Sequence, residues 1–196
     1  MIRKVGLTGG IGSGKTLIAR IFEKLNIPVF YADEEAKLLI TNDLGIQKEI
    51  KAEFGEDIFQ QGKLDKEKFA SIIFHEQEKL QKVHQIVHPR VREVFATWAD
   101  KQNAPYVIME AAILFESGGY KFMDENVLVY APEELRIERV IKRDNATAED
   151  VKARIRHQQP DEEKINKADW VLYNDGKKMV LPQIIELDKI LKEKNS

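Results

Sequence analysis

Cysteine is absent from this sequence of 196 residues. Its absence excludes disulfide bonds, cysteine-ligated zinc sites and cysteine nucleophiles. Four histidines remain, and their spacing does not match a zinc motif. A chain of this length can bury roughly 70% of the surface that its unfolded form exposes, so it needs no disulfide or metal to fold.

Long apolar runs are also missing. No stretch approaches the roughly 18 apolar residues of a membrane-spanning helix, and the apolar segment near the start is too short for a signal peptide. Neither sign of charge dominates, because 31 basic residues are balanced by 33 acidic ones. This balance argues against a protein whose whole surface binds nucleic acid. We therefore expect a soluble, cytoplasmic protein with neither a membrane nor a nucleic acid as partner.

Short apolar segments alternate with amphipathic helical patterns along most of the chain. Helical patterns occupy residues 16–25, the residues after Pro132 and residues 179–194. This alternation is typical of an α/β fold in which helices cover both faces of a five-stranded parallel sheet. The predicted strands are residues 5–8, 28–32, 106–109, 127–130 and 170–173.

The long gap between the second and third predicted strands shows helical periodicity and no strong strand. We interpret residues 44–100 as an inserted helical lobe, and residues 1–43 and 101–196 as the core. A second, highly charged excursion at about 144–160 is interpreted as a lid. Within it, Thr147 and Asp150 resemble a helix-capping box, with Asp in place of the usual Glu or Gln.

The segment Gly9-Gly10-Ile11-Gly12-Ser13-Gly14-Lys15-Thr16 matches the P-loop pattern and lies between a predicted strand and a predicted helix. Its glycines let backbone N–H groups surround phosphate oxygens, Lys15 reaches the β- and γ-phosphates, and the Thr16 hydroxyl binds Mg²⁺. A Rossmann motif fails here, because it needs glycine where Lys15 or Leu17 stands. The predicted nucleotide-binding residues are Gly10, Ile11, Gly12, Ser13, Gly14, Lys15, Thr16 and Leu17.

A second nucleotide motif, N-K-x-D, is matched by Asn166-Lys167-Ala168-Asp169 and is familiar from regulatory GTPases. In those proteins the motif follows an apolar strand, whereas here a polar segment precedes it and the apolar strand comes after. The chain also lacks D-x-x-G, the motif by which such switches sense loss of the γ-phosphate. We interpret the match as coincidental, and a regulatory GTPase is the weaker alternative.

A kinase with a small-molecule acceptor is the stronger interpretation. Asp33 ends the second strand, at the edge where open α/β sheets bind ligands, so its carboxylate could accept the acceptor's proton or orient its hydroxyl. Capping the following helix is an equally good interpretation. Arg136, Arg139 and Arg143 share one helix face, which either clamps a transferring phosphoryl group or is simply solvated. The pattern does not identify the acceptor, so a nucleoside or nucleoside-monophosphate kinase stays an alternative.

Several segments, in order, resemble those of dephospho-CoA kinases, and together they are much more specific than the P-loop alone. The resemblance implies that the chain phosphorylates the ribose 3′-hydroxyl of dephospho-coenzyme A, using ATP and Mg²⁺, in the last step of coenzyme A synthesis. We also predict no obligate protein partner. The matching segments are Gly6–Thr16, Ala32-Asp33 with Ala36, Ile86–Arg92, Ile113–Gly118, Arg139-x-x-x-Arg143-Asp144 with Gln158, and Ala168-Asp169 with Asn174-x-Gly176.

The resemblance also implies roles on the acceptor side. Asp33 is implied to be the base or hydroxyl-orienting group, while His88 and Arg92 line the acceptor site. Without the resemblance, His88 reads as a core or helix-terminal histidine, with Pro89 ending the helix. Glu116 is a further acceptor-side candidate, and a carboxylate at a helix start is the alternative.

On the nucleotide side, the resemblance implies that Arg139 and Arg143 close over the phosphates and that Asn174 lies near the adenine. Two departures from the family pattern affect the site. Tyr31 stands where the family often has an aspartate, so only Asp33 remains as the base. Glu110 stands where aspartate is commoner, and its carboxylate is expected to hold Mg²⁺ through water, together with Thr16.

Overall fold

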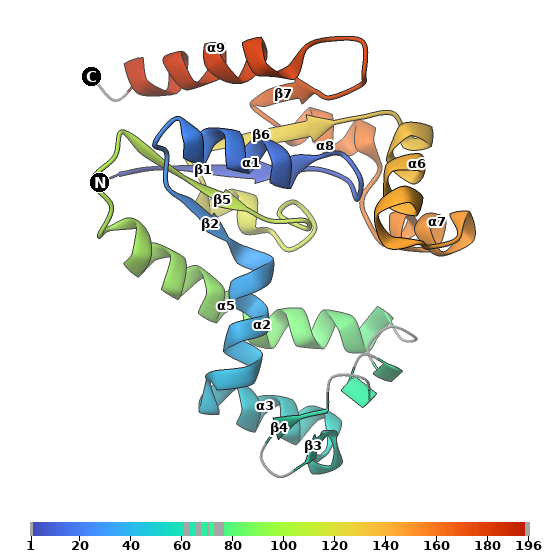
Figure 1. Cartoon of the computed structure of the whole chain (residues 1–196). Coiled ribbons are helices and arrows are strands. Elements are labelled where there is room, and N and C mark those ends of the chain that lie inside the picture. Colours follow the sequence, from blue (N-terminus) through green and yellow to red (C-terminus); the bar gives the residue numbers. More distant parts are fainter. Residues whose placement is uncertain (1, 61–62, 66–67, 70, 73–76, 195–196) are drawn as a thin grey trace. The chain divides into compact units, whose positions relative to one another are not determined.

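A computed structural model describes residues 2–60, 63–65, 68–69, 71–72 and 77–194 of the chain (Figure 1). The chain divides into two compact units, one formed by residues 1–31 and 98–196 and the other by residues 32–97. No helix among the described residues is both long and apolar enough to cross a membrane. One histidine of the sequence, His75, lies outside the described residues.

The first unit contains a five-stranded sheet in which every strand runs parallel to its neighbours (Figure 1). The structure confirms the predicted parallel sheet, and it starts β1 and β6 two residues earlier than the sequence pattern did. Because β1 is the central strand, the glycine-rich loop that follows it leaves the middle of the sheet. In spatial order the strands are β2 (Val29–Tyr31), β5 (Tyr106–Glu110), β1 (Arg3–Thr8), β6 (Glu125–Tyr130) and β7 (Trp170–Tyr173).

Helices α1 (Lys15–Lys24) and α9 (Val180–Glu193) pack together and against the sheet. Their apolar side chains share one core with alternate residues of the strands, and fully burying one such side chain stabilises the fold by about 1.5–3 kcal/mol. The strand residues between them are buried as well, as expected for a parallel sheet covered on both faces. The core includes Val5, Leu7, Ile18, Phe22, Ile108, Val127, Leu172, Ile184 and Leu187.

Three helices lie between β6 and β7 in the chain: α6 (Glu133–Asp144), α7 (Ala148–Arg156) and α8 (Asp161–Lys167). Helix α6 packs against α7, and α8 packs against β6. The predicted capping box at α7 is confirmed, because Thr147 and Asp150 exchange side-chain-to-backbone hydrogen bonds. Elsewhere in this unit, a short 3-10 helix, η2, spans Gly119–Phe122.

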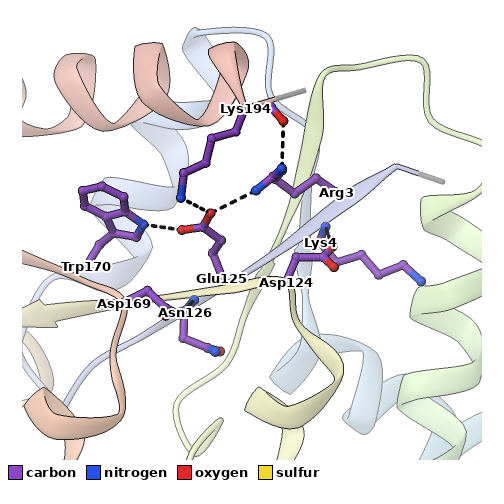
Figure 2. A network of polar contacts seen from close by, with 8 residues as sticks. All are labelled: Arg3, Lys4, Asp124, Glu125, Asn126, Asp169, Trp170 and Lys194. Atoms are coloured by element: carbon purple, nitrogen blue, oxygen red, sulfur yellow. Dashed lines mark hydrogen bonds and ion pairs between the residues drawn. The ribbon is translucent and has the colours of Figure 1, made fainter. Parts of the chain in front are cut away.

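A network of charged groups fastens the sheet at the amino ends of β1 and β6 (Figure 2). The Glu125 carboxylate, which is 8% exposed, accepts hydrogen bonds from Arg3 Nη1 at 2.9 Å, Lys194 Nζ at 2.5 Å and Trp170 Nε1 at 2.5 Å. Arg3 Nη2 also donates to the backbone oxygen of Lys194 at 2.9 Å. These bonds join β1, β6, β7 and the residue that follows α9, at the edge of the sheet opposite the glycine-rich loop.

The second unit is mainly helical, and α2 packs against α3. It begins at Ala32, earlier than the lobe expected at residue 44, because α2 belongs to it. Asp43 caps α3 by accepting the N–H groups of Gly45 and Ile46, and it also pairs with Arg90 of α5 at 3.1 Å. The elements are α2 (Ala32–Asn42), α3 (Leu44–Phe54), η1 (Glu56–Ile58), β3 (Phe59–Gln60), β4 (Lys63–Leu64) and most of α5 (Gln77–Ala99).

The sequence pattern showed no strong strand in this unit, and β3 and β4, which pair antiparallel over two residues each, are too short to produce a periodic signal. One expectation for this unit was wrong. Pro89 was expected to end a helix and instead lies inside α5. A proline within a helix removes one backbone hydrogen bond, but buried residues spaced by four on either side of it, Val83, Val87 and Val91, keep the helix packed.

Candidate active site

The glycine-rich loop connects Thr8 at the end of β1 to Lys15 at the start of α1. Gly12 and Gly14 have φ angles of +79° and +93°, which only glycine adopts without strain. A side chain at Gly12 would also lie 2.4 Å from the backbone oxygen of Arg136. The loop turns through a hydrogen bond from Ser13 N–H to Gly10 O of 2.9 Å. The backbone angles of the loop and its close approach to Arg136 therefore explain why the P-loop pattern has glycine at these positions.

Three of the predicted residues meet where this loop enters α1. The Glu110 carboxylate lies at the end of β5, with only 4% of the residue exposed. Its Oε1 atom accepts a hydrogen bond from Thr16 Oγ1 at 3.3 Å and lies 3.4 Å from Lys15 Nζ. Parallel strands β1 and β5 place these groups together because both end at the same edge of the sheet.

The chemistry of this cluster fits Mg²⁺. Mg²⁺ prefers oxygen ligands and usually combines one or two carboxylates with waters and substrate phosphates. Thr16 and Glu110 supply a hydroxyl oxygen and a carboxylate oxygen 3.3 Å apart. Within the part of the chain that the structure describes, no group of three or more His, Cys, Asp or Glu side chains could hold a metal. Thr16 and Glu110 therefore fit a site at which waters and phosphate oxygens would complete the coordination of the ion.

Arg139 and Asn174 hold the glycine-rich loop by its carbonyl groups. Asn174 Nδ2 donates to Ser13 O at 2.8 Å. Arg139 Nη2 donates to Asn174 O at 3.0 Å, and its Nη1 atom lies 3.5 Å from Gly12 O. Both predicted residues are therefore next to the loop, and the Asn174 amide bonds the loop itself.

Arg136 is buried against the loop, although the resemblance to the family implied roles for Arg139 and Arg143 only. It is 3% exposed, and its Nη2 atom donates to Asp161 Oδ2 at 2.9 Å. A side chain at Gly10 would lie 2.0 Å from Arg136 Nη1, so the guanidinium packs directly on the loop. Arg136 shares its helix face with Arg139 and Arg143. Helical spacing shows that the three side chains lie on one face, but it does not show which of them is buried.

Arg143 lies in a different environment. Its side chain is 63% exposed and pairs with Asp144, with bonds of 2.7 and 3.0 Å. This ion pair raises the pKa of Arg143 and lowers that of Asp144. Arg154 also pairs with Asp144, at 3.3 Å. Among the described residues, the Arg143 contacts thus lie within the predicted lid segment rather than at the loop.

Glu116 is bound to the segment that leads into α8. Its Oε1 atom accepts from Gln159 N–H at 3.0 Å and pairs with Lys164 Nζ at 3.1 Å, where the Lys164 side chain is 1% exposed. The neighbouring Gln158 connects two parts of the nucleotide side. Gln158 Oε1 accepts from Ile11 N–H at 2.8 Å, and Gln158 Nε2 donates to Ala112 O at 3.2 Å.

The acceptor-side candidates lie in the second unit. The capping interpretation requires Asp33 to precede the helix. Asp33 is instead the second residue of α2, so this interpretation was wrong. On α5, His84, His88 and Arg92 are spaced by four residues and share one face. The His84 and His88 rings are stacked, with centroids 4.7 Å apart and planes at 15°.

Both histidines on this face are held neutral near pH 7. Burial, with the added effects of His84 and Arg92, lowers the pKa of His88 to about 4. Burial also lowers the pKa of His84, and the charge of Asp33 opposes that shift. His84 therefore lies close enough to both Asp33 and His88 to interact with each of them. The sequence signal that could have found His84 is its spacing of four from His88.

Comparisons with known proteins agree with one another. A family model described as dephospho-CoA kinase matches residues 3–179. A Bacteroides fragilis (strain YCH46) protein named dephospho-CoA kinase is 44% identical, over 99% of this chain and 95% of that protein. The crystal structure of TT1252 from Thermus thermophilus matches with a TM-score of 0.82 at 34% identity, covering 98% of this chain and 97% of that one. The Campylobacter jejuni dephospho-CoA kinase shares the fold, with a TM-score of 0.70 at 24% identity over the whole of both chains.

Proposed function

This chain belongs to the dephospho-CoA kinase family, and on that basis we propose which residues perform each part of the reaction. The activity is ATP-dependent phosphorylation of the ribose 3′-hydroxyl of dephospho-coenzyme A, the final step of coenzyme A synthesis. The observation that carries the assignment of residues is the meeting of Lys15, Thr16 and Glu110 at the end of the glycine-rich loop.

We assign ATP binding to residues 10–17. Backbone N–H groups of the loop and the amino end of α1 bind the phosphates, since both present partial positive charge. Lys15 neutralises the charge that develops as the γ-phosphoryl group moves. Asn174 and Arg139 hold the loop in shape through Ser13 O and Gly12 O, which leaves its N–H groups for the nucleotide. Asn174 at the adenine and Leu17 beside the nucleotide stay predictions.

Thr16 and Glu110 would hold Mg²⁺, Glu110 through water. The chemistry that Mg²⁺ would supply there is positive charge, which would reduce the negative charge of the phosphates. Glu110 lies beside both Lys15 and Thr16, so its carboxylate is in place for this role.

On the acceptor side, we assign to Asp33 the role of accepting the proton of the 3′-hydroxyl or orienting its oxygen. Asp33 follows β2 by two residues, and β2 ends at the carboxyl edge of the parallel sheet. His88 and Arg92 contact the acceptor. Because His88 is neutral, Arg92 supplies the positive charge for an anionic acceptor, while the imidazole supplies a hydrogen bond.

The remaining candidates act around the transferring group. Arg139 binds the phosphates, and Arg143 joins them when residues 144–160 close as a lid and exclude water. Glu116 stays an acceptor-side candidate. We also infer a cytoplasmic location and no obligate protein partner. Cell fractionation and the mass of the purified protein in solution test these two inferences.

The test of the activity is an ATP-consumption panel with dephospho-coenzyme A, nucleosides and nucleoside monophosphates as acceptors. Phosphorylated products are identified by mass spectrometry. We expect product with dephospho-coenzyme A alone. Turnover only with a nucleoside monophosphate would contradict the assignment.

Asp33→Asn tests the role of the acceptor-side carboxylate. General-base groups contribute typically 10²–10⁴-fold, so we expect kcat to fall by about that factor while ATP affinity stays within about twofold. The matched control is Glu34→Gln, an exposed carboxylate on the same helix, which should keep its kcat. A normal kcat in Asp33→Asn would remove Asp33 from this role.

A further inference from the structure

The side chain of Gln158 occupies a backbone donor of the glycine-rich loop. Its Oε1 atom accepts from Ile11 N–H at 2.8 Å, while its Nε2 atom donates to Ala112 O at 3.2 Å. The backbone of Gln158 is fixed by its own N–H, which bonds Ile155 O at 2.9 Å. Gln158 lies in the connection between α7 and α8, so this connection is attached to the loop by a side-chain amide.

This contact differs in kind from the other side-chain bonds to the loop. Asn174 and Arg139 donate to loop carbonyl groups, which an anionic ligand does not use. Gln158 instead accepts from an N–H group, and N–H groups are what such a loop offers to phosphate. A phosphate oxygen and Gln158 Oε1 therefore compete for the same donor, whereas Asn174 and Arg139 do not compete with the nucleotide.

We propose that Gln158 is a positioning residue that competes with phosphate for Ile11 N–H. Its amide oxygen satisfies this donor and holds the connection between α7 and α8 against the loop. When ATP binds, a phosphate oxygen takes the donor, since hydrogen bonds to charged acceptors are roughly twice as strong as neutral ones. The side chain keeps its bond to Ala112 O and the connection loses its attachment to the loop. The proposal rests on the proposed binding of ATP by residues 10–17.

The test measures ATP affinity by calorimetry in Gln158→Met and Gln158→Glu. Met keeps the length of the side chain and removes the acceptor, so the melting temperature of the free protein should fall while ATP binds more tightly. The net strength of one hydrogen bond corresponds to roughly a 2- to 10-fold gain in affinity. Glu keeps the acceptor and adds negative charge, so ATP should bind about 10-fold or more weakly. A residue that only supports the loop would weaken ATP binding in both variants.

Two controls isolate the competition. Gln183→Met removes a bond of the same type, from Tyr173 N–H to Gln183 Oε1 at 2.9 Å, and should lower stability without tightening ATP binding. Adenosine lacks phosphate, so Gln158→Met should leave its affinity unchanged. If the wild-type protein does not bind ATP, the proposed function fails. If it does, and Gln158→Met binds ATP equally or more weakly, the competition is refuted.

A measurement on the wild-type protein covers the case in which Gln158→Met does not fold. The NMR signals of the Ile11 amide and of the Gln158 side-chain amide are followed as ATP or adenosine is added. Competition predicts that both signals shift with ATP and that neither shifts with adenosine. A Gln158 signal that stays in place as the Ile11 signal shifts with ATP would refute the proposal.

Discussion

Replacing Glu125 by Gln should destabilise the protein by an amount that its contacts allow one to calculate. The carboxylate is 8% exposed and accepts three hydrogen bonds, from Arg3, Lys194 and Trp170 (Figure 2). Gln keeps the shape but has one acceptor atom instead of two, so one donor loses its partner and two lose a charged acceptor. A hydrogen bond to a charged group contributes about 1.5–3 kcal/mol.

The Lys194 contribution must be reduced, because its side chain is 44% exposed and solvent screens the pair. The remaining loss is on the order of 3 kcal/mol. For a chain of this length each kcal/mol shifts the melting temperature by about 2–4 °C, which gives a fall of roughly 6–12 °C. Thermal melts followed by circular dichroism measure this fall, and urea unfolding followed by Trp fluorescence measures the free energy.

The pH dependence gives this prediction a second test. Burial raises the pKa of Glu125, but the hydrogen bonds from Lys194 and Trp170 outweigh it, so the folded-state pKa lies below the unfolded value of 4.5. The stabilisation is therefore complete above pH 4.5 and is lost as pH falls through the folded-state pKa. The difference between wild type and Glu125→Gln should shrink at acid pH.

The control for this prediction is Glu193→Gln, whose carboxylate is 66% exposed and pairs with Lys189 at 3.9 Å. It should shift the melting temperature by about 1 °C or less, because exposed ion pairs contribute little. A Glu125→Gln effect no larger than that of the control, or a difference that does not change with pH, would refute the calculation.

Two further changes act on the nucleotide side. Glu110→Gln should raise the Mg²⁺ concentration needed for half-maximal activity by about 10–100-fold, measured in a magnesium titration at saturating ATP, and an unchanged titration would exclude Glu110 from the metal site. Gly12→Ala should weaken ATP binding by about 10-fold or more in calorimetry, because the left-handed backbone at φ +79° disfavours alanine and its Cβ would lie 2.4 Å from Arg136 O. Normal affinity in this variant would show that the loop can relax around the new side chain.

The strands and most helices were predictable because the pattern of apolar residues along the chain shows them. Buried strands form continuous apolar runs, and helices repeat apolar residues every three to four positions. Residues 127–130 form a continuous apolar run and lie in β6, while the charged residue Glu125 also lies in β6 and was left out. Glu125 has polar partners from three other segments, and one sequence does not reveal partners far apart in the chain. Pro89 was misjudged for a related reason, since the buried contacts that keep α5 intact on both sides of it come from tertiary packing.

The candidate site was predictable where a motif fixes local geometry, and less so where long-range packing decides. Lys15, Thr16 and Glu110 meet because strand ends of a parallel sheet share an edge, which the pattern of strands already implied. Helical spacing put Arg136 and Arg143 on one face, yet one is 3% exposed and the other has a side chain that is 63% exposed. Arg136 is buried because it packs on the loop at Gly10 and pairs with Asp161, 25 residues further along the chain, and helical spacing shows neither contact.

Most of the buried side-chain atoms that lack a hydrogen-bond partner among the described residues lie around the glycine-rich loop. Thr8 Oγ1, Ser13 Oγ and Arg136 Nε belong to the strand end before the loop, to the loop itself and to the arginine packed on it, and the other two such atoms are Glu116 Oε2 and Asn126 Oδ1. Each such group costs about 1–3 kcal/mol, so the fold keeps them at the expense of stability.

The hydroxyl group of Ser13 is one of these buried groups without a partner. A buried group without a partner stabilises nothing in the free protein, so Ser13→Ala should leave the melting temperature of the free enzyme unchanged or raise it. Groups kept at such a cost are typical of functional sites, where a ligand supplies the missing partner.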